Sequence, residues 1–245
     1  MGNDEFDVSL DVMSECLGRD ADSHSPTLRR YHQLLWSKPL PSGGSFDLVI
    51  PKRKSDGYLI YDAPAGPMWF GSDAITNSYT GWMRPRALVE AMAGLGSVEK
   101  ERLLNPPYTV ASAMIWPVRS EHRPTINQAR GTRAKIADRM DLTLECIRRH
   151  YRAEDGSPLQ DVLANYADFF ALFTGFRQFV DFFHFQDLVA SDYSGVEFFL
   201  PFDGFETSGV PASVDEYVAC REGTIDFEDR RRMRMAAFAR TIHLS

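Results

Sequence analysis

The strongest constraint on the fold of this chain is the crowding of phenylalanine into one segment. Twelve of the 17 phenylalanines in its 245 residues lie between Phe169 and Phe205. Large apolar rings leave water when a chain folds, so this segment is predicted to form the core. Residues 177–190 are apolar on nearly all sides, which is typical of a central buried helix. The rings expected to be buried are Phe170, Phe173, Phe179, Phe182 and Phe183.

The order of the predicted elements indicates an α+β fold. The N-terminal half is expected to hold short mixed or antiparallel strands separated by turn residues, at 46–50, 58–61, 68–70 and 108–118. The C-terminal half is predicted to be helical and rich in phenylalanine, and to pack with the strands as one core.

Proline and glycine mark the expected helix boundaries. Ser25 followed by Pro26 predicts a helix start, because serine caps the first amides and proline fits the first turn. A single domain, residues 1–245, is the simplest interpretation. It includes a polar N-terminal segment at 1–24 with a short strand at 6–12. It ends in a helical extension at 205–245, divided into helices at 211–221 and 224–242.

Basic residues are concentrated between positions 119 and 152. This region has nine basic and four acidic residues, a balance of +5 in a chain whose net charge is −7. A polar loop is predicted at 119–134 and a charged helix at 136–151. Local positive charge in an acidic chain marks the place where an anionic ligand is expected to bind.

Backbone amides in a glycine-containing turn at a helix start suit a phosphate or carboxylate group, and neighbouring guanidinium groups strengthen that interaction. We therefore predict a concave ligand site that combines this loop with the helix start near residue 25. The predicted ligand-binding residues are Arg123, Asn127, Gln128, Arg130, Arg133, His24 and Arg29.

An alternative interpretation of the same region is structural. The arginines can pair with Asp138, Asp141 and Glu145, and Asn127 and Gln128 can hold the loop by internal hydrogen bonds. Clusters of opposite charge are more often ion-pair networks than binding sites.

His184 and Asp181 are the candidate catalytic residues. A spacing of three places His184 within reach of Asp181 or Asp187 on one helix, and an imidazole beside a carboxylate can act as a general base. The alternative is a core histidine whose hydrogen bonds are satisfied internally.

The sequence favours no cofactor and no metal. Residues 20–24 could offer two aspartates and a histidine, but one short loop rarely supplies a full coordination set. There is no paired cysteine motif, phosphate-binding glycine loop, dinucleotide fingerprint or nucleophile elbow. The acidic charge argues against general coating of nucleic acid. Three scattered cysteines and the lack of a long apolar run indicate a cytoplasmic protein that does not span a membrane.

Four blocks of the sequence resemble an uncharacterised family of bacterial proteins, a domain of unknown function. The blocks are SHSPTLRRYHQLLWSKPLPSG at 23–43, TINQARG at 125–131, DRMDLTLECIRRHY at 138–151 and SPL at 157–159. The resemblance covers residues 6–205. It implies a shared fold and a bacterial, cytoplasmic, single-domain protein, and it assigns no activity, cofactor or catalytic residue.

The function expected from these features is the binding of a phosphate-bearing ligand such as a nucleotide or a nucleic-acid end, with or without its chemical processing. No reaction is assigned, so whether the protein is an enzyme stays open. The alternative is a non-catalytic regulatory or interaction module with a protein partner, which would use the acidic surface and exposed aromatic residues. The aromatic residues considered for that role are Trp36, Trp69 and Trp82.

Overall fold

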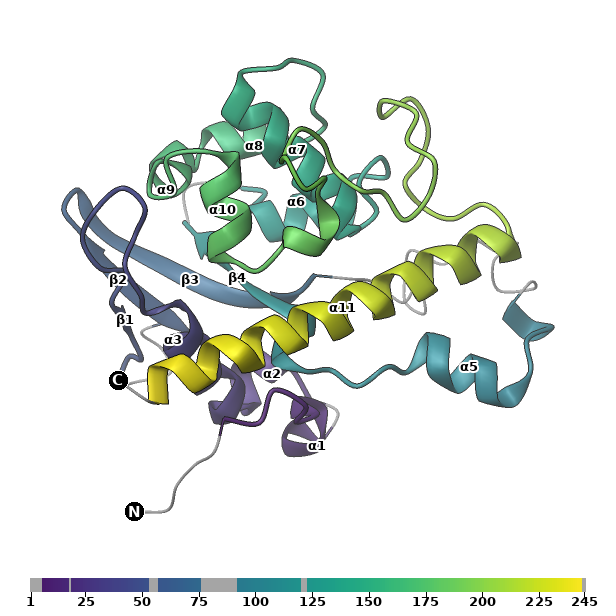
Figure 1. Ribbon diagram of the computed structural model, residues 1–245, viewed down its shortest axis with the longest axis horizontal. Helices are drawn as coiled ribbons and strands as arrows, with labels where there is room; N and C mark the ends of the chain where they lie inside the picture. Colours follow the sequence, from purple (N-terminus) through teal and green to yellow (C-terminus); the bar gives the residue numbers. More distant parts are fainter. Residues whose placement is uncertain (1–5, 18, 53–56, 76–91, 120–122, 244–245) are drawn as a thin grey trace.

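The structure is a computed structural model, and it describes residues 6–17, 19–52, 57–75, 92–119 and 123–243. This part of the chain forms helices and the strands of one sheet, which Figure 1 labels. The N-terminal elements are α1 (Val12–Cys16), α2 (Ala21–His24), α3 (Pro26–Trp36), β1 (Leu48–Val49), β2 (Leu59–Ala63) and β3 (Gly66–Ala74). They are followed by α5 (Ser97–Leu104), the 3₁₀ helix η2 (Val110–Ser112) and β4 (Ala113–Val118). The C-terminal elements are α6 (Ile126–Thr132), α7 (Met140–Arg152), α8 (Gln160–Ala164), α9 (Ala167–Ala171), α10 (Phe176–Phe182), the 3₁₀ helix η3 (Gln186–Leu188) and α11 (Val214–His243).

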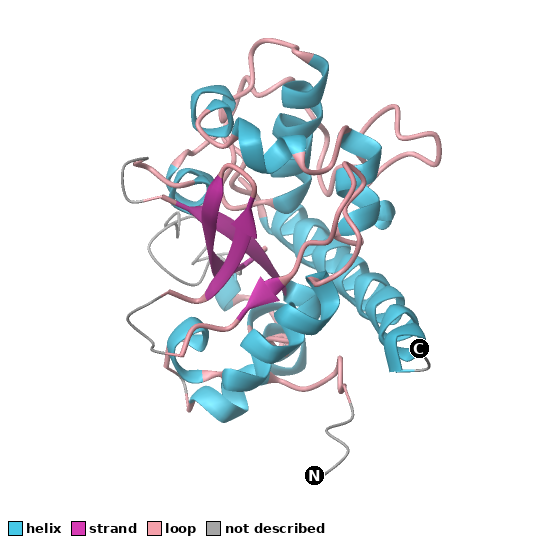
Figure 2. Ribbon diagram, turned by 90° about the vertical axis from the view of Figure 1, so that its left-hand side faces the viewer, coloured by secondary structure: helices cyan, strands magenta, loops and turns pink. Residues whose placement is uncertain are grey.

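The sheet is antiparallel, with its strands in the order β1-β2-β3-β4. Figure 2 shows helices above and below it, and Figure 1 shows α6 to α10 grouped on one side of it and α1 to α3 on the other. The α+β prediction and its N-terminal strands are confirmed, except that the strand predicted at 108–118 begins at Ala113, after the 3₁₀ helix η2. Past Phe70, β3 pairs with β4 and no longer with β2, so one edge of this end of β3 is open to other partners.

The predicted helix start at Ser25 is confirmed. The Ser25 hydroxyl accepts the Leu28 amide at 2.9 Å, and Pro26 is the first helical residue of α3. The strand predicted at 6–12 is wrong. Val12 instead begins α1, because the Asp11 carboxylate accepts the Met13 amide and caps a helix there.

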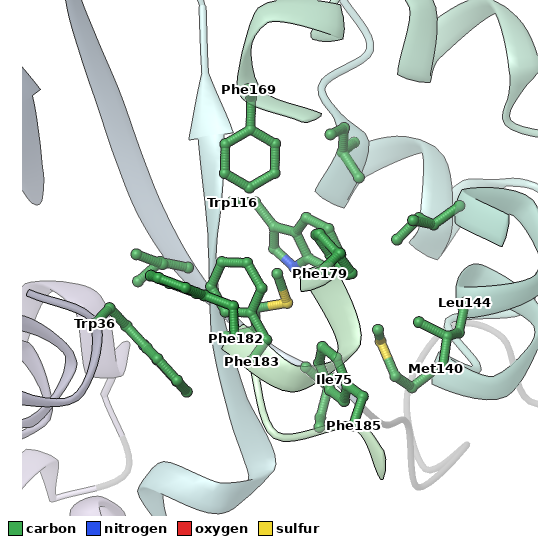
Figure 3. Packing of buried hydrophobic residues seen from close by; sticks show 14 of the residues in the cluster. Trp36, Ile75, Trp116, Met140, Leu144, Phe169, Phe179, Phe182, Phe183 and Phe185 are labelled. Atoms are coloured by element: carbon green, nitrogen blue, oxygen red, sulfur yellow. The ribbon is translucent and has the colours of Figure 1, made fainter. Parts of the chain in front are cut away.

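The five phenylalanines predicted to be buried are all in the main hydrophobic cluster, and none is more than 5% exposed. Figure 3 shows the rings of Phe179, Phe182 and Phe183 between Trp36 of α3 and Met140 and Leu144 of α7. The cluster extends from Val12 to Met235, so it takes residues from both halves of the chain. A smaller cluster of Met92, Leu103, Ala137, Tyr217 and Cys220 lies beside it.

The buried helix predicted at 177–190 ends earlier, at Phe182. His184 has a φ of +58°, and the Phe185 amide donates to the Val180 carbonyl at 2.9 Å. A left-handed residue with this long backward bond is the usual helix-ending turn, in which glycine is the favoured residue. The turn brings Phe185 back into the core. The helix therefore ends here, and one more ring is buried.

The two C-terminal helices that were predicted form one continuous helix, α11. Gly223 lies inside it, where a Cβ atom would be 2.9 Å from the Phe199 ring. This glycine therefore admits a neighbouring ring and does not end the helix. Figure 1 shows α11 running past α3 and toward α5, and it contacts both. No helix in the described residues has the length and apolar character needed to cross a membrane.

Candidate functional site

Part of the predicted polar loop at 119–134 is the helix α6. The Thr125 hydroxyl accepts the Gln128 amide at 3.3 Å, and the Gln128 side chain accepts the Thr125 amide at 3.1 Å. This reciprocal cap satisfies two of the amides at the helix start, those of Thr125 and Gln128. Gly131 lies within the helix and not in a turn before it. Gln128 thus serves as a cap of α6.

Arg130 is fully buried and acts as a clamp between α6, α7 and β3. Its guanidinium donates to the Thr143 hydroxyl and the Ile75 carbonyl, each at 3.0 Å. It also pairs with Asp138 at 3.2 Å and with Asp73 at 3.5 Å, and it stacks on a tryptophan ring. A buried guanidinium with this many internal acceptors is held in place by the fold and is closed to an outside ligand.

No hydrogen bond or ion pair joins the other described residues of the predicted loop site to one another. Arg133 forms a two-bond ion pair with Asp161, at 2.6 and 2.8 Å, and also donates to the Pro158 carbonyl. This hydrogen bonding raises the pKa of Arg133 further above its ordinary value. Arg123 is exposed. Asn127 is half-buried, and its side-chain oxygen has no hydrogen-bond partner.

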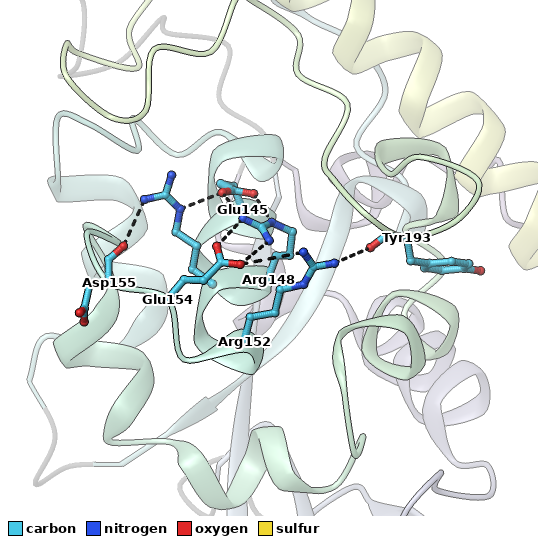
Figure 4. A network of polar contacts seen from close by, with 7 residues as sticks. Glu145, Arg148, Arg152, Glu154, Asp155 and Tyr193 are labelled. Atoms are coloured by element: carbon cyan, nitrogen blue, oxygen red, sulfur yellow. Dashed lines mark hydrogen bonds and ion pairs between the residues drawn. The ribbon is translucent and has the colours of Figure 1, made fainter.

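The charged face of α7 is an internal ion-pair network, as Figure 4 shows. Glu145 accepts from Arg148 at 2.7 and 2.9 Å and from Arg149 at 2.8 Å, and Arg148 also reaches Glu154. Glu145 and Arg148 are buried, whereas Arg152 and Glu154 are exposed, so the network runs from the interior to the surface. The structural interpretation therefore accounts for these arginines.

A cavity of about 200 Å³ lies at the start of α7, beside this basic region. It lies between the start of α7 and the segment 200–212. Its lining includes Lys135, Arg139, Phe202, Phe205 and Gly209. A Cβ atom at Gly209 would be 2.7 Å from a Leu142 methyl carbon and 3.1 Å from two backbone oxygens. Only glycine permits this close approach, so Gly209 fixes the wall of the cavity.

The charged side chains around this cavity differ in whether they are already paired within the protein. Arg139 pairs with the buried Asp141 and donates to the Gly209 carbonyl at 3.2 Å. The Asp203 carboxylate accepts the Thr207 hydroxyl and two backbone amides, and these bonds lower its pKa. Lys135 is exposed, and its ammonium has no ion pair in the described part of the chain. It is the cation best placed to meet a ligand.

A second polar group of residues surrounds the open edge of β3. Asp22 Oδ2 accepts the Ser72 amide at 2.9 Å, which supplies the missing strand partner. Arg29 donates to the Asp22 carbonyl at 3.1 Å and lies over the Tyr58 ring. Arg29 thus contacts Asp22, which binds Ser72 of β3, whereas Arg130 pairs with Asp73 of the same strand. His24 contacts the Asp20 carbonyl within its own helix.

His32 and Ser72 form a contact that superficially matches a serine–histidine pair. His32 Nδ1 must accept the Trp36 indole hydrogen at 3.0 Å, because an indole can only donate. The proton of the neutral ring is therefore on Nε2, which donates to Ser72 Oγ at 3.1 Å. Burial lowers the pKa of His32 to about 3, which keeps the ring in this neutral form. His32 cannot take a proton from Ser72, so the pair is structural.

Two carboxyl groups near this edge titrate close to neutral pH. Burial raises the pKa of Asp22 to about 7, against the opposing effect of the Ser72 amide. Burial also raises the pKa of Asp73 to about 7, against the effect of Arg130. Such shifts are common at functional sites but also arise in structural networks. Asp22 closes a strand edge, so its main role is in the fold.

The predicted catalytic residues His184 and Asp181 have separate environments. Asp181 accepts from Tyr193 at 2.6 Å and from Gln186 at 3.2 Å, whereas Asp187 pairs with Arg234. His184 packs between Trp36 and Phe238, and its Nε2 atom is buried without a hydrogen-bond partner. Burial lowers the pKa of His184 to about 3, so its ring is neutral.

The aromatic residues considered for an interaction surface are only partly exposed. Trp36 is fully buried in the core, so its expected exposure is wrong. Trp69 is 39% exposed and lies beside Ile60, which in turn pairs with the exposed Val49. Trp82 lies outside the described residues. The interaction-module alternative therefore retains one of its three aromatic residues in the described structure.

Within the described residues, no group of three histidine, cysteine, aspartate or glutamate side chains is arranged to hold a metal ion. The lining of the α7 cavity offers the Lys135 ammonium, the rings of Phe202 and Phe205, and backbone polar groups. It also includes the carboxylates of Asp203, which is held by internal hydrogen bonds, and Glu216, which accepts the Ala212 amide.

The sequence profile of a Family of unknown function (DUF6994) matches residues 5–235. The chain belongs to this family. The DUF6994 match confirms the resemblance found in four sequence blocks, and it extends past residue 205 into α11, where no resemblance was predicted. A search of curated proteins and a search of solved structures each found no match. The DUF6994 family assigns no activity, so function has to be argued from the residues.

Sequence reasoning missed the residues that line the α7 cavity. Lys135 was counted in the basic region but not chosen, because its lack of an acidic partner is visible only in the fold. Phe202 and Phe205 were assigned to the core with the other phenylalanines, which is correct for Phe205, whereas Phe202 is half-buried.

Proposed function

We propose that the protein binds a small phosphate-bearing ligand, such as a nucleoside monophosphate, in the cavity at the start of α7. The observation that carries this proposal is the position of Lys135, an exposed and unpaired ammonium within the described residues, at the mouth of a cavity of about 200 Å³. A phosphate group gains most from a cation that is not already neutralised by the protein.

Aromatic side chains on the facing wall support a ligand with a planar base. Phe202 stacks on Phe198 with the ring centres 4.2 Å apart and meets Phe205 edge to face at 4.9 Å. Both residues line the cavity, but Phe205 is buried in the main cluster, so the half-buried Phe202 is the ring proposed to meet a base. The proposal thus moves the predicted anion site from the α6 arginines, which are internally paired, to the adjacent end of α7.

Calorimetric titration with AMP, GMP, CMP and UMP, and with inorganic phosphate alone, tests the proposal. We expect at least one nucleotide to bind the wild-type protein, and we expect its affinity to fall as salt is added, because the main contact is electrostatic. Lys135→Gln should weaken that binding by about tenfold, the loss of one charge-assisted hydrogen bond of about 1.5 kcal/mol.

Lys52→Gln is the matched control, because Lys52 is also exposed but lies outside the cavity. It should leave the affinity unchanged. The proposal fails if no ligand in the set binds, or if Lys135→Gln and the wild-type protein bind equally well.

We also propose that the protein is bacterial and works in the cytoplasm. The three cysteines are free thiols and all are buried, which suits a reducing compartment.

A further inference from the structure

A second cavity lies between α11 and the segment that joins α5 to η2. Its volume is about 140 Å³, close to that of about five water molecules in the liquid. Pro107 is exposed and Pro106 is half-buried, so the cavity reaches the surface beside these prolines. Its lining combines α11 with residues 104–108, through Arg221, Glu228, Leu104, Pro106, Pro107 and Tyr108.

The two charged residues of this lining are deeply buried. Arg221 is 2% exposed and Glu228 is 8% exposed. Glu228 follows Arg221 by seven positions in α11, so both lie on one face of the helix, about 10 Å apart along its axis. Burying charges is costly, and a cavity with a few convergent polar groups in its wall is typical of a site that orients a small ligand.

Both charged groups can bind a ligand in addition to their contacts within the protein. Arg221 Nε donates to the Leu103 carbonyl of α5 at 2.8 Å, which fixes the direction of the side chain. A guanidinium has five N–H donors, four of them on its terminal nitrogens, so it can also hold a carboxylate by two parallel bonds. A carboxylate such as that of Glu228 has about four acceptor positions, so it can accept from an ammonium group as well as from the protein.

The opposite wall is held in place before any ligand binds. The Tyr108 amide donates to the Asp11 carboxylate at 3.2 Å, and the Tyr108 carbonyl accepts the Val12 amide at 2.8 Å. Proline has a fixed φ, so Pro106 and Pro107 make the chain before Tyr108 stiff. A ligand that enters this cavity therefore does not bear the cost of ordering its wall.

A smaller cavity of about 40 Å³ adjoins the first one. It shares Glu228 and both prolines with the first cavity, and it adds the side chain of Ile225. Asp229 and Arg232 also line it and pair with each other at 2.6 Å. The space next to Glu228 is therefore bounded by apolar groups and by an ion pair within the protein, which suits a small side chain without charge.

We propose that these cavities bind a small amino acid in its zwitterionic form, with its carboxylate on Arg221 and its ammonium on Glu228. The arrangement that carries the proposal is the pair of buried, opposite charges that line one cavity of this volume. A ligand with only a negative charge would be repelled by Glu228, and one with only a positive charge would be repelled by Arg221. An amino acid is attracted by both. The site is separate from the α7 cavity, because the two share no lining residue.

Ligand-detected NMR with the complete chain tests the proposal, using glycine, L-alanine, β-alanine, L-serine and L-proline. Propionate and ethylamine serve as probes with one charge each, because they lack the amine and the carboxylate of alanine, respectively. We expect at least one amino acid to bind with a Kd of about 1 mM or tighter. Propionate and ethylamine should bind at least about tenfold more weakly, because each makes only one of the two charged contacts. The proposal is wrong if no amino acid of the set binds, or if either probe binds as well as the amino acids.

Glu228→Gln keeps the shape of the side chain and removes its charge, so it should weaken amino-acid binding by at least about tenfold. Glu222→Gln is the matched control, because Glu222 is exposed on the same helix and pairs with Arg102 outside the cavity. Circular dichroism shows whether each variant is folded. A folded Glu228→Gln protein that binds like wild type would overturn the proposal. If Glu228→Gln does not fold, the comparison of alanine with propionate and ethylamine on the wild-type protein decides.

Discussion

At the scale of single residues, Asp22 makes stability depend on pH. Its pKa of about 7 in the folded protein is above the ordinary value of 3.8, so the folded state holds a proton that the unfolded state has lost. Stability from this group is therefore complete below about pH 4 and is lost as pH rises toward 7. Asp22→Asn keeps an oxygen that can accept the Ser72 amide but removes the charge. It should stabilise the protein at pH 8 by about 1 kcal/mol, after allowing for partial solvent exposure, and change little at pH 4.

Urea unfolding at pH 4 and pH 8 measures this effect as a difference between variant and wild type, so that other titrating groups cancel. Asp62→Asn, an exposed carboxylate on β2, is the control and should give no such difference. Equal stabilities of Asp22→Asn and wild type at both pH values would mean that Asp22 ionises normally in the folded state.

Single residues also show what the sequence could and could not predict. Burial of Phe170 and Phe183 was predictable, because apolar rings have few alternatives to the core. The burial of Arg130 was not, because its partners include the backbone oxygens of Ala74 and Ile75, which are more than 50 residues away. Charge alone does not distinguish a guanidinium that faces a ligand from one that faces the protein. The candidate site in the structure therefore differs from the one predicted around Arg130.

At the scale of elements, α7 ends in a strained residue. Ala153 has a φ of +52°, and the Glu154 amide donates to the Arg149 carbonyl at 2.9 Å. Glycine adopts this left-handed conformation without the steric cost that alanine carries. Ala153→Gly should therefore raise the free energy of unfolding by about 1 kcal/mol. Thermal and urea unfolding both measure it.

The matched change is Ala237→Gly, at an exposed right-handed position inside α11. Glycine there should lower stability by about 1 kcal/mol, because it gains freedom in the unfolded chain without relieving strain. Changes of the same sign at both positions would show that the end of α7 is not strained.

The start of α3 was easier to predict than the ends of α7 and α10. Ser25 and Pro26 carry the signal for α3 in their own chemistry, which is local. The ends of α7 and α10 occur at Ala153 and His184, which offer no local signal, since neither residue favours a left-handed backbone as glycine does. Gly223 was predicted to separate two helices, but it lies inside α11, where a larger residue would collide with the Phe199 ring. Packing between distant segments decides these boundaries.

At the scale of the whole molecule, Arg231 ties α11 to the sheet and to the phenylalanine core. It is fully buried and donates to the carbonyls of Ala111, Ala113 and Phe183, at 2.5, 2.8 and 3.2 Å. Arg231→Leu leaves three buried carbonyls without this donor, so it should destabilise the protein by about 3 kcal/mol or more. Because the main hydrophobic cluster extends from Val12 to Met235, we expect one cooperative transition in which helix signal and tryptophan fluorescence change together.

Arg230→Leu is the control, because Arg230 is exposed on the same helix and pairs with Asp226. An exposed ion pair contributes little, so this variant should stay within about 1 kcal/mol of wild type. If Arg231→Leu lost helix signal well before tryptophan fluorescence changed, α11 would unfold as a separate unit and the prediction of one domain would be wrong. A joint shift of both signals to lower urea concentration is the result expected when α11 closes the same core that the strands and the phenylalanines build.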